Sequence, residues 1–209
     1  SWRTGLWNRY TFDSTATHGR KGWDFYALYQ AGANVLRGLS IYETDSARIS
    51  VVVPFYTPYR YLPPPALTLG ILLNLVPSIT AFWIWVIVIE LLFLYCCWRS
   101  WRLANSVNED LILVVLWLLY SPYYLELYMG QFTFVESVLI LVMMLWPEQR
   151  TNRLDFDLVW AASLAWKQLT ILFAPLWILW RRWRGVALSL GLVALLSLPY
   201  LVFTPAALT

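Results

Sequence analysis

A series of long apolar stretches, separated by short polar loops, most constrains how this 209-residue chain folds. A helix needs about 20 apolar residues to cross the hydrocarbon core of a bilayer. Stretches near that length are predicted at 79–98, 110–128, 131–146 and 185–203. Only 13% of the residues are charged, whereas a soluble domain carries about 25%. The sequence therefore predicts an all-α polytopic (multi-pass) integral membrane protein.

The apolar stretch 156–180 is interrupted by Lys167 and Gln168. One continuous helix over this stretch would be about 37 Å long and would place the lysine at the bilayer centre. A charge there costs several kcal/mol unless it faces a polar cavity. We therefore predict two half-length helices that meet at Lys167, because irregular backbone at that depth is tolerated where it lines protein or water.

Arginines in short loops predict the orientation. By the positive-inside rule, the pair Arg99 and Arg102, the pair Arg150 and Arg153, and the 181–184 cluster lie in the cytoplasm. This arrangement puts residues 1–65 on the extracytoplasmic side. A loop of that length is largely exempt from the charge rule.

Residues 1–65 contain no apolar run that could span, and we treat 66–209 as the transmembrane helical bundle. The pattern over 23–37 predicts an amphipathic helix that lies flat at the bilayer surface. The proline-rich segment 54–65 is predicted to be extended and not helical. The apolar stretch 66–76 is too short to span.

Asp24 lies among aromatic residues at the start of the helix predicted over 23–37. One interpretation is that it is a working carboxylate above the bilayer. The other is that it only caps the helix, because an aspartate before a helical run accepts hydrogen bonds from free amides in either case.

Several classes of function are disfavoured by composition. The two cysteines, Cys96 and Cys97, are adjacent, and there is one histidine, so neither a disulfide nor a metal site is expected. The net charge of +3 is spread along the chain without a basic run on a soluble face, so no nucleic-acid partner is expected. The expected partner is the lipid bilayer itself.

The order of several short motifs resembles glycosyltransferase family 87, the polyprenol-phosphate-mannose-dependent mannosyltransferases and their relatives with the GT-C fold. These motifs are Asp24-Phe25-Tyr26 with Ala31, Gly38 and Tyr42; Tyr61 with Pro63-Pro64; Gly130-Gln131; and Lys167 with Pro175 before arginines. The resemblance implies a GT-C-like helical bundle with an extracytoplasmic loop that carries juxtamembrane helices. It also implies residence in a bacterial plasma membrane.

The resemblance further implies inverting transfer of a sugar, mannose or similar, from a polyprenyl-phosphate donor to an acceptor hydroxyl. Asp24 is the candidate general base, and Lys167 and Arg60 are the candidate ligands of the donor phosphate. The candidate sugar or acceptor ligands are Gln131, Gln168, Tyr59 and Tyr61. No metal and no cofactor are expected, since the lipid-phosphate sugar is a substrate.

Each assignment has a structural alternative. Lys167 would instead reach the membrane surface or neutralise Glu126 or Glu136. Arg60 would be an interfacial anchor, and Gly130-Gln131 a turn between helices. Family members are usually longer, so we expect this chain to be part of a longer protein. The alternative function is a non-catalytic, transferase-like structural subunit of a larger membrane complex with other membrane subunits.

Overall fold

The computed structural model describes residues 21–103, 111–112, 115–117, 119, 121–144 and 154–204, and every regular element in them is helical. The helices are α3 (Trp23–Leu36), α4 (Pro63–Pro65), the π-helix η1 (Ala66–Gly70), α5 (Ile71–Leu73), α6 (Ser78–Leu103), α8 (Ser121–Met129), α9 (Thr133–Met144), α10 (Leu154–Trp166), the 3₁₀-helix η3 (Gln168–Phe173), α11 (Ala174–Leu179) and α12 (Trp183–Phe203). The predicted all-α class is confirmed for this part of the chain. The Arg150 and Arg153 pair and the side chain of Glu126 lie outside it.

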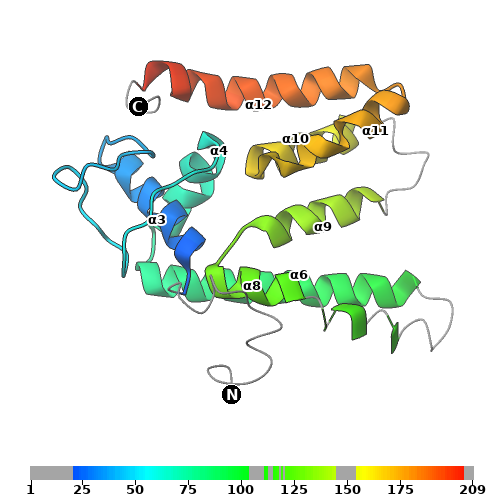
Figure 1. The fold of residues 1–209 in the computed structure, drawn as a ribbon, viewed down its shortest axis with the longest axis horizontal. Coiled ribbons are helices and arrows are strands. Elements are labelled where there is room, and N and C mark those ends of the chain that lie inside the picture. The colour runs from blue at the N-terminus through cyan, green and yellow to red at the C-terminus, as the bar shows by residue number, and fades with distance from the viewer. Residues whose placement is uncertain are drawn as a thin grey trace.

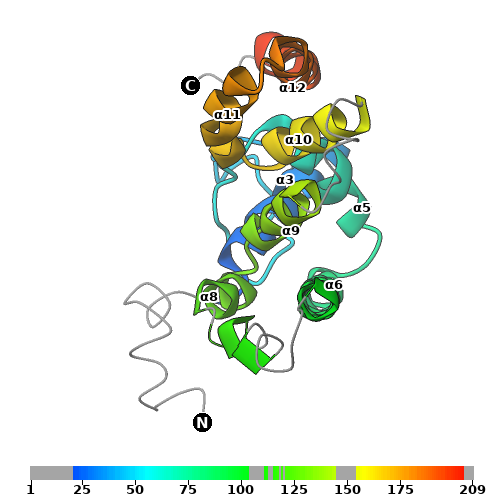
Figure 2. The ribbon, with the colours of Figure 1, turned by 90° about the vertical axis from the view of Figure 1, so that its right-hand side faces the viewer.

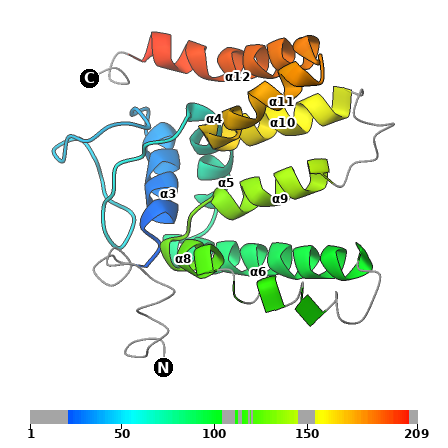
Figure 3. The same cartoon turned by 45° about the vertical axis from the view of Figure 1, so that its right-hand side comes forward.

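Four helices, α6, α9, α10 and α12, lie one above another (Figure 1). Seen from the side, α6 and α12 are both viewed nearly end-on, so their axes are nearly parallel (Figure 2), and the colours show that the chain runs along them in opposite directions (Figure 1). Contacts join α6 to α9, α9 to α10, and α10 to α12. At one end of this stack α3 crosses the direction of the long helices (Figure 3). The start of α9 and the end of α10 lie at the same end.

Within the described residues, two helices are long and apolar enough to cross a membrane, over Ser78–Arg102 and Trp183–Phe203. These helices cover the stretches 79–98 and 185–203. Leucines along α12, among them Leu188, Leu195 and Leu198, are exposed. An apolar surface of this kind suits a lipid environment. The shorter apolar helices are Pro63–Leu73, Thr133–Met143 and Gln168–Leu179.

Helix α3 differs from the surface helix that the sequence predicts over 23–37, because every residue from Phe25 to Asn34 is buried. Close backbone contact explains part of this burial. A Cβ added to Gly32 would lie 2.1 Å from the carbonyl oxygen of Gly70, so only glycine lets α3 and η1 touch. The Asn74 amide also donates to the Tyr29 carbonyl oxygen at 2.9 Å. The predicted amphipathic helix is a core helix of the described chain.

The burial of α3 also depends on two amide side chains, Gln30 and Asn34, which form hydrogen bonds with the loop between α3 and α4. The Gln30 side chain donates to the Ser50 carbonyl oxygen at 3.1 Å and accepts from the Val52 amide at 3.0 Å. Gln30 also donates to Asn34, whose own amide donates to the Ser40 carbonyl oxygen at 3.4 Å. The polar face of α3 therefore binds the loop and is not left for solvent.

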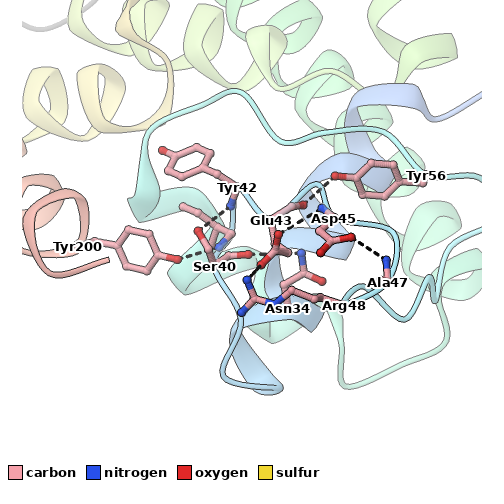
Figure 4. A network of polar contacts seen from close by, with 10 residues as sticks. Asn34, Ser40, Tyr42, Glu43, Asp45, Ala47, Arg48, Tyr56 and Tyr200 are labelled. Carbon is pink, nitrogen blue, oxygen red and sulfur yellow. Dashed lines mark hydrogen bonds and ion pairs between the residues drawn. The ribbon is translucent and has the colours of Figure 1, made fainter. Parts of the chain in front are cut away.

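Further polar contacts tie this loop to itself and to α12 (Figure 4). The Glu43 carboxylate forms an ion pair with Arg48 at 2.9 Å, and the Tyr56 hydroxyl donates to the Glu43 carbonyl oxygen at 2.8 Å. The Ile41 amide donates to the Tyr200 hydroxyl of α12 at 2.7 Å. The loop is thus hydrogen-bonded both to α3 and to α12.

The proline-rich segment also differs from the prediction at its end. Pro63, Pro64 and Pro65 form α4, the first turn of the helical stretch that continues into η1. Proline is tolerated in a first helical turn because the amide hydrogen that it lacks has no intrahelical acceptor there. Leu62, just before this turn, is extended, with a ψ of 156°.

Helices α10 and α12 are joined by a buried ion pair. Arg182 contacts Asp157 at 2.7 Å, and the Ser189 hydroxyl donates to the Asp157 carbonyl oxygen at 3.0 Å. A Cβ added to Gly185 would lie 2.5 Å from Asp157 Oδ1, so this glycine makes room for the carboxylate. Arg182 belongs to the 181–184 cluster, and the structure gives it a packing role.

We predict that Gly32→Ala destabilises the protein by about 1–3 kcal/mol, because the added methyl group overlaps the Gly70 backbone. Gly191→Ala in α12 is the matched control, since a Cβ there meets no atom within 4 Å. The measurement is the apparent unfolding temperature of both variants in detergent. Equal unfolding temperatures for the two variants would show that α3 and η1 do not touch.

Candidate active site

Two glycines with left-handed backbone bring the start of α3 against the turn between α8 and α9. Gly22 has a φ of 77° and Gly130 a φ of 66°, values that other residues rarely adopt. A Cβ added to Gly130 would lie 2.6 Å from Phe25 Cβ and 3.4 Å from Gly22 Cα. The Gly22 amide donates to the Tyr128 carbonyl oxygen at 2.9 Å. Both segments are therefore held backbone to backbone.

Asp24 and Gln131 follow these glycines, and their side chains are hydrogen-bonded, with the Gln131 amide as donor. Asp24 lies in the first turn of α3. The N-cap residue of that helix is Gly22, and no side chain caps it. The interpretation of Asp24 as a cap is therefore wrong. The carboxylate still benefits from its position at the positive end of the helix dipole.

Two cations also act on Asp24. Burial raises the pKa of the Asp24 carboxyl above its ordinary value, while the Gln131 hydrogen bond and the charges of Lys167 and Arg60 lower it by less. A carboxylate whose pKa is raised holds a proton more strongly, which makes it a better base near neutral pH. Three predicted site residues from three other segments, Gln131, Lys167 and Arg60, thus lie close enough to Asp24 to affect its charge.

Lys167 lies where the helix breaks. Its backbone is extended, with φ −151° and ψ 127°, between the end of α10 and the start of η3. The Lys167 ammonium donates to the Thr133 hydroxyl and lies 5.9 Å from the centre of the Tyr61 ring. An ammonium over an aromatic face is attracted by the ring quadrupole. Both contacts direct the Lys167 ammonium toward other residues of the described chain.

Tryptophan side chains satisfy carbonyl groups around this break. Trp166 Nε1 donates to the Phe132 carbonyl oxygen at 3.1 Å, which joins the end of α10 to the start of α9. Trp160 Nε1 donates to the Thr170 carbonyl oxygen at 3.2 Å, which joins α10 to η3. Backbone polar groups in an apolar setting must find such partners. These two hydrogen bonds therefore stabilise the break between α10 and η3.

The two tyrosines that flank Arg60, Tyr59 and Tyr61, have different surroundings. Tyr59 is buried, and its hydroxyl donates to the Leu62 carbonyl oxygen at 2.8 Å, while burial raises the pKa of the phenol. Tyr61 is half-buried and packs edge-on against Phe132 at 5.7 Å between ring centres. Tyr61 therefore faces Lys167, and Tyr59 packs behind it at 5.6 Å.

Arg60 and Gln168 are both exposed. Arg60 nevertheless acts on the Asp24 charge, whereas Gln168, at the start of η3, is not among the groups that act on it. Among the described residues, no cluster of three or more His, Cys, Asp or Glu side chains is placed to hold a metal ion.

Sequence reasoning gave Thr133 no role, and it named Glu136 only as a charge that Lys167 would neutralise. In the structure, Thr133 binds the Lys167 ammonium, and the Lys167 charge acts on Glu136. Their spacing was the available signal, because residues three apart share one face of a helix. A Thr-x-x-Glu pattern three residues after Gly130 could have placed both beside the Gly130-Gln131 turn.

Comparison with known proteins gives a match to one family model. The model of glycosyltransferase family 87 matches residues 60–209, which include Arg60, Gln131 and Lys167. Asp24 lies before the matched region. The comparison with curated proteins finds no match, and neither does the comparison with solved structures.

We predict that Gly130→Ala separates Gln131 from Asp24 and destabilises the fold by more than Gly38→Ala does. Both glycines have positive φ, 66° and 73°, so the two substitutions share the same backbone strain. A Cβ on Gly38 meets nothing within 4 Å, whereas one on Gly130 overlaps Phe25. The difference in unfolding temperature between the two variants therefore measures the packing alone, and no difference would contradict the described contact.

Proposed function

This chain belongs to glycosyltransferase family 87, and on that premise we propose that it transfers a sugar from a polyprenyl-phosphate donor to an acceptor hydroxyl with inversion. One observation supports this proposal most strongly. The buried carboxylate of Asp24 is acted on by one hydrogen-bond donor, Gln131, and by two cations, Lys167 and Arg60. An acid beside two cations suits a reaction in which a base removes a proton from the acceptor and cations stabilise the phosphate that the donor releases.

In the proposed step, the acceptor hydroxyl oxygen forms a bond to the anomeric carbon of the donor sugar. Asp24 takes the hydroxyl proton as that bond forms, because a neutral hydroxyl is a poor nucleophile. The bond from the anomeric carbon to the phosphate oxygen breaks, and its electron pair leaves with the polyprenyl phosphate. Attack and departure on opposite faces invert the sugar configuration.

The cations stabilise the charge that grows on the leaving phosphate. Lys167 is a half-buried, fixed ammonium, and Arg60 offers a guanidinium from the exposed side. Charges preorganised in a partly dry site stabilise such a transition state more than they would in water. Roles for both in phosphate binding are therefore part of the proposal.

The remaining predicted residues are assigned to the sugars. Gln131 holds Asp24 and offers its amide oxygen to a hydroxyl, and the Tyr61 ring offers an apolar platform beside Lys167. Tyr59 supports that ring from behind. Gln168, exposed at the start of η3, would reach a substrate from the other side of Lys167.

We place the reaction on the extracytoplasmic side of a bacterial plasma membrane, with mannose or a similar hexose as the sugar. Two long apolar helices and the family support a membrane location. Arg99 and Arg102 at the end of α6, and Arg181 and Arg182 between α11 and α12, support the orientation.

Asp24→Asn should lower transfer by about 10²–10⁴-fold, because the amide cannot take the hydroxyl proton. The assay is sugar transfer from polyprenyl-phosphate mannose to hydroxyl acceptors in membranes. The control Asp45→Asn removes an exposed carboxylate from the loop and should retain activity. Normal transfer by folded Asp24→Asn would exclude Asp24 as the base and would favour the structural-subunit alternative.

The pH profile gives a second test. Because burial raises the pKa of Asp24, its proton is lost only at a pH above the ordinary aspartate range, and transfer should rise with pH through that raised value. Gln131→Leu removes the hydrogen bond that favours the ionised form, so it should move this rise to higher pH. An unchanged profile in an active Gln131→Leu variant would mean that another group sets it.

A further inference from the structure

Glu136 is a second buried carboxylate close to the proposed site. Only 2% of its surface is exposed, although it is an ionisable side chain on the first turn of α9. One carboxylate oxygen accepts a hydrogen bond from the Thr170 backbone amide. The other, Oε1, has no hydrogen-bond partner among the described residues. A buried carboxylate left in this state is costly unless a cation lies nearby.

The nearby cation is Lys167, since the charges of Glu136 and Lys167 act on one another. Thr133 and Glu136 are three residues apart, so both lie on the face of α9 that meets the break between α10 and η3. Thr133 binds the Lys167 ammonium directly, while Glu136 binds the backbone three residues beyond it. Helix α9 thus presents one neutral acceptor and one negative charge to the break.

We propose that Glu136 is a positioning residue, which holds the Lys167 ammonium at the α10–η3 break so that it faces the donor phosphate. This inference rests on the proposed function, in which Lys167 stabilises the leaving phosphate. Glu136 acts through Lys167 and touches neither the donor nor the acceptor.

The charges around Lys167 explain why a counter-charge apart from Asp24 is needed. The charge of Lys167 acts on Asp24 of α3 and on Glu136 of α9, and the charge of Arg60, in the loop, also acts on Asp24. If Asp24 were the sole carboxylate near Lys167, the two would form an ion pair, and the stabilised carboxylate would be a weaker base. Because Glu136 supplies a negative charge for Lys167, Asp24 can instead take the proton of the acceptor hydroxyl.

The chain offers a direct test, because Lys21 and Lys167 are its only lysines. Acetic anhydride reacts with neutral amines, and peptide mass spectrometry reads the two lysines separately. Loss of a nearby negative charge favours the neutral amine. In Glu136→Gln, acetylation of Lys167 at pH 8 should therefore be about threefold faster or more, while that of Lys21 stays unchanged.

Two controls separate charge from exposure. Glu90→Gln makes the same chemical change at an α6 carboxylate and should leave both lysines unchanged. As the labelling pH is raised, charge limits the reaction less, so the wild-type and Glu136→Gln rates for Lys167 should converge. A rate difference that persists at high pH would mean only that Lys167 has become more exposed, and would overturn the proposal.

Unchanged Lys167 labelling in folded Glu136→Gln would also overturn it. If that variant does not fold, Glu136→Asp keeps the charge but retracts it, and Lys167 labelling identical to wild type would then overturn the proposal. Transfer should fall about tenfold or more in Glu136→Gln, with partial rescue in Glu136→Asp. Because labelling needs no donor, a wild-type protein that shows the labelling effect but no transfer would refute the proposed function and leave the placement of Lys167 intact.

Discussion

The contact between Gly22 and Gly130 is the constraint on which the arrangement of the site depends. Both residues have positive φ, and a Cβ on Gly130 would overlap Phe25. Since the two backbones touch, the residues that follow each glycine, Asp24 and Gln131, are placed within hydrogen-bonding distance. The position of the acid is thus set by backbone packing and does not depend on a flexible loop.

The second half of the site depends on a broken helix. Lys167 occupies an extended residue between α10 and η3, so its side chain leaves the direction of α10 and meets α9. Trp166 and Trp160 satisfy carbonyl groups of the flanking segments. A cation at this position would be costly on an unbroken apolar helix. Here the hydroxyl of Thr133 and the nearby carboxylates offset that cost.

The helical class and the family were predictable because they depend on local composition and on short motifs. The roles of the predicted site residues stay predictions. The burial of α3 was not predictable from its pattern. Gln30 and Asn34 form a polar face along α3, yet the loop around Ser50 binds that face and covers it. Contacts between Gly32 and Gly70, or between Gly22 and Gly130, join segments far apart in sequence, and no local periodicity reveals them. Glu136 was considered as a counter-charge for Lys167, but the sequence did not separate it from Glu126, because both candidates are more than 30 positions from Lys167.

The central claim is that Asp24 on α3 and Lys167 at the helix break share one site. Cross-linking tests it most directly: Cys96 and Cys97 are replaced by serine, cysteines are introduced by Asp24→Cys and Lys167→Cys, and the folded protein is treated in membranes with a short bifunctional thiol reagent. The account predicts an intrachain cross-link between positions 24 and 167, identified by peptide mass spectrometry, and none between positions 45 and 167 in the control Asp45→Cys with Lys167→Cys. Absence of the first product in a folded protein, or equal yields of both, would contradict it.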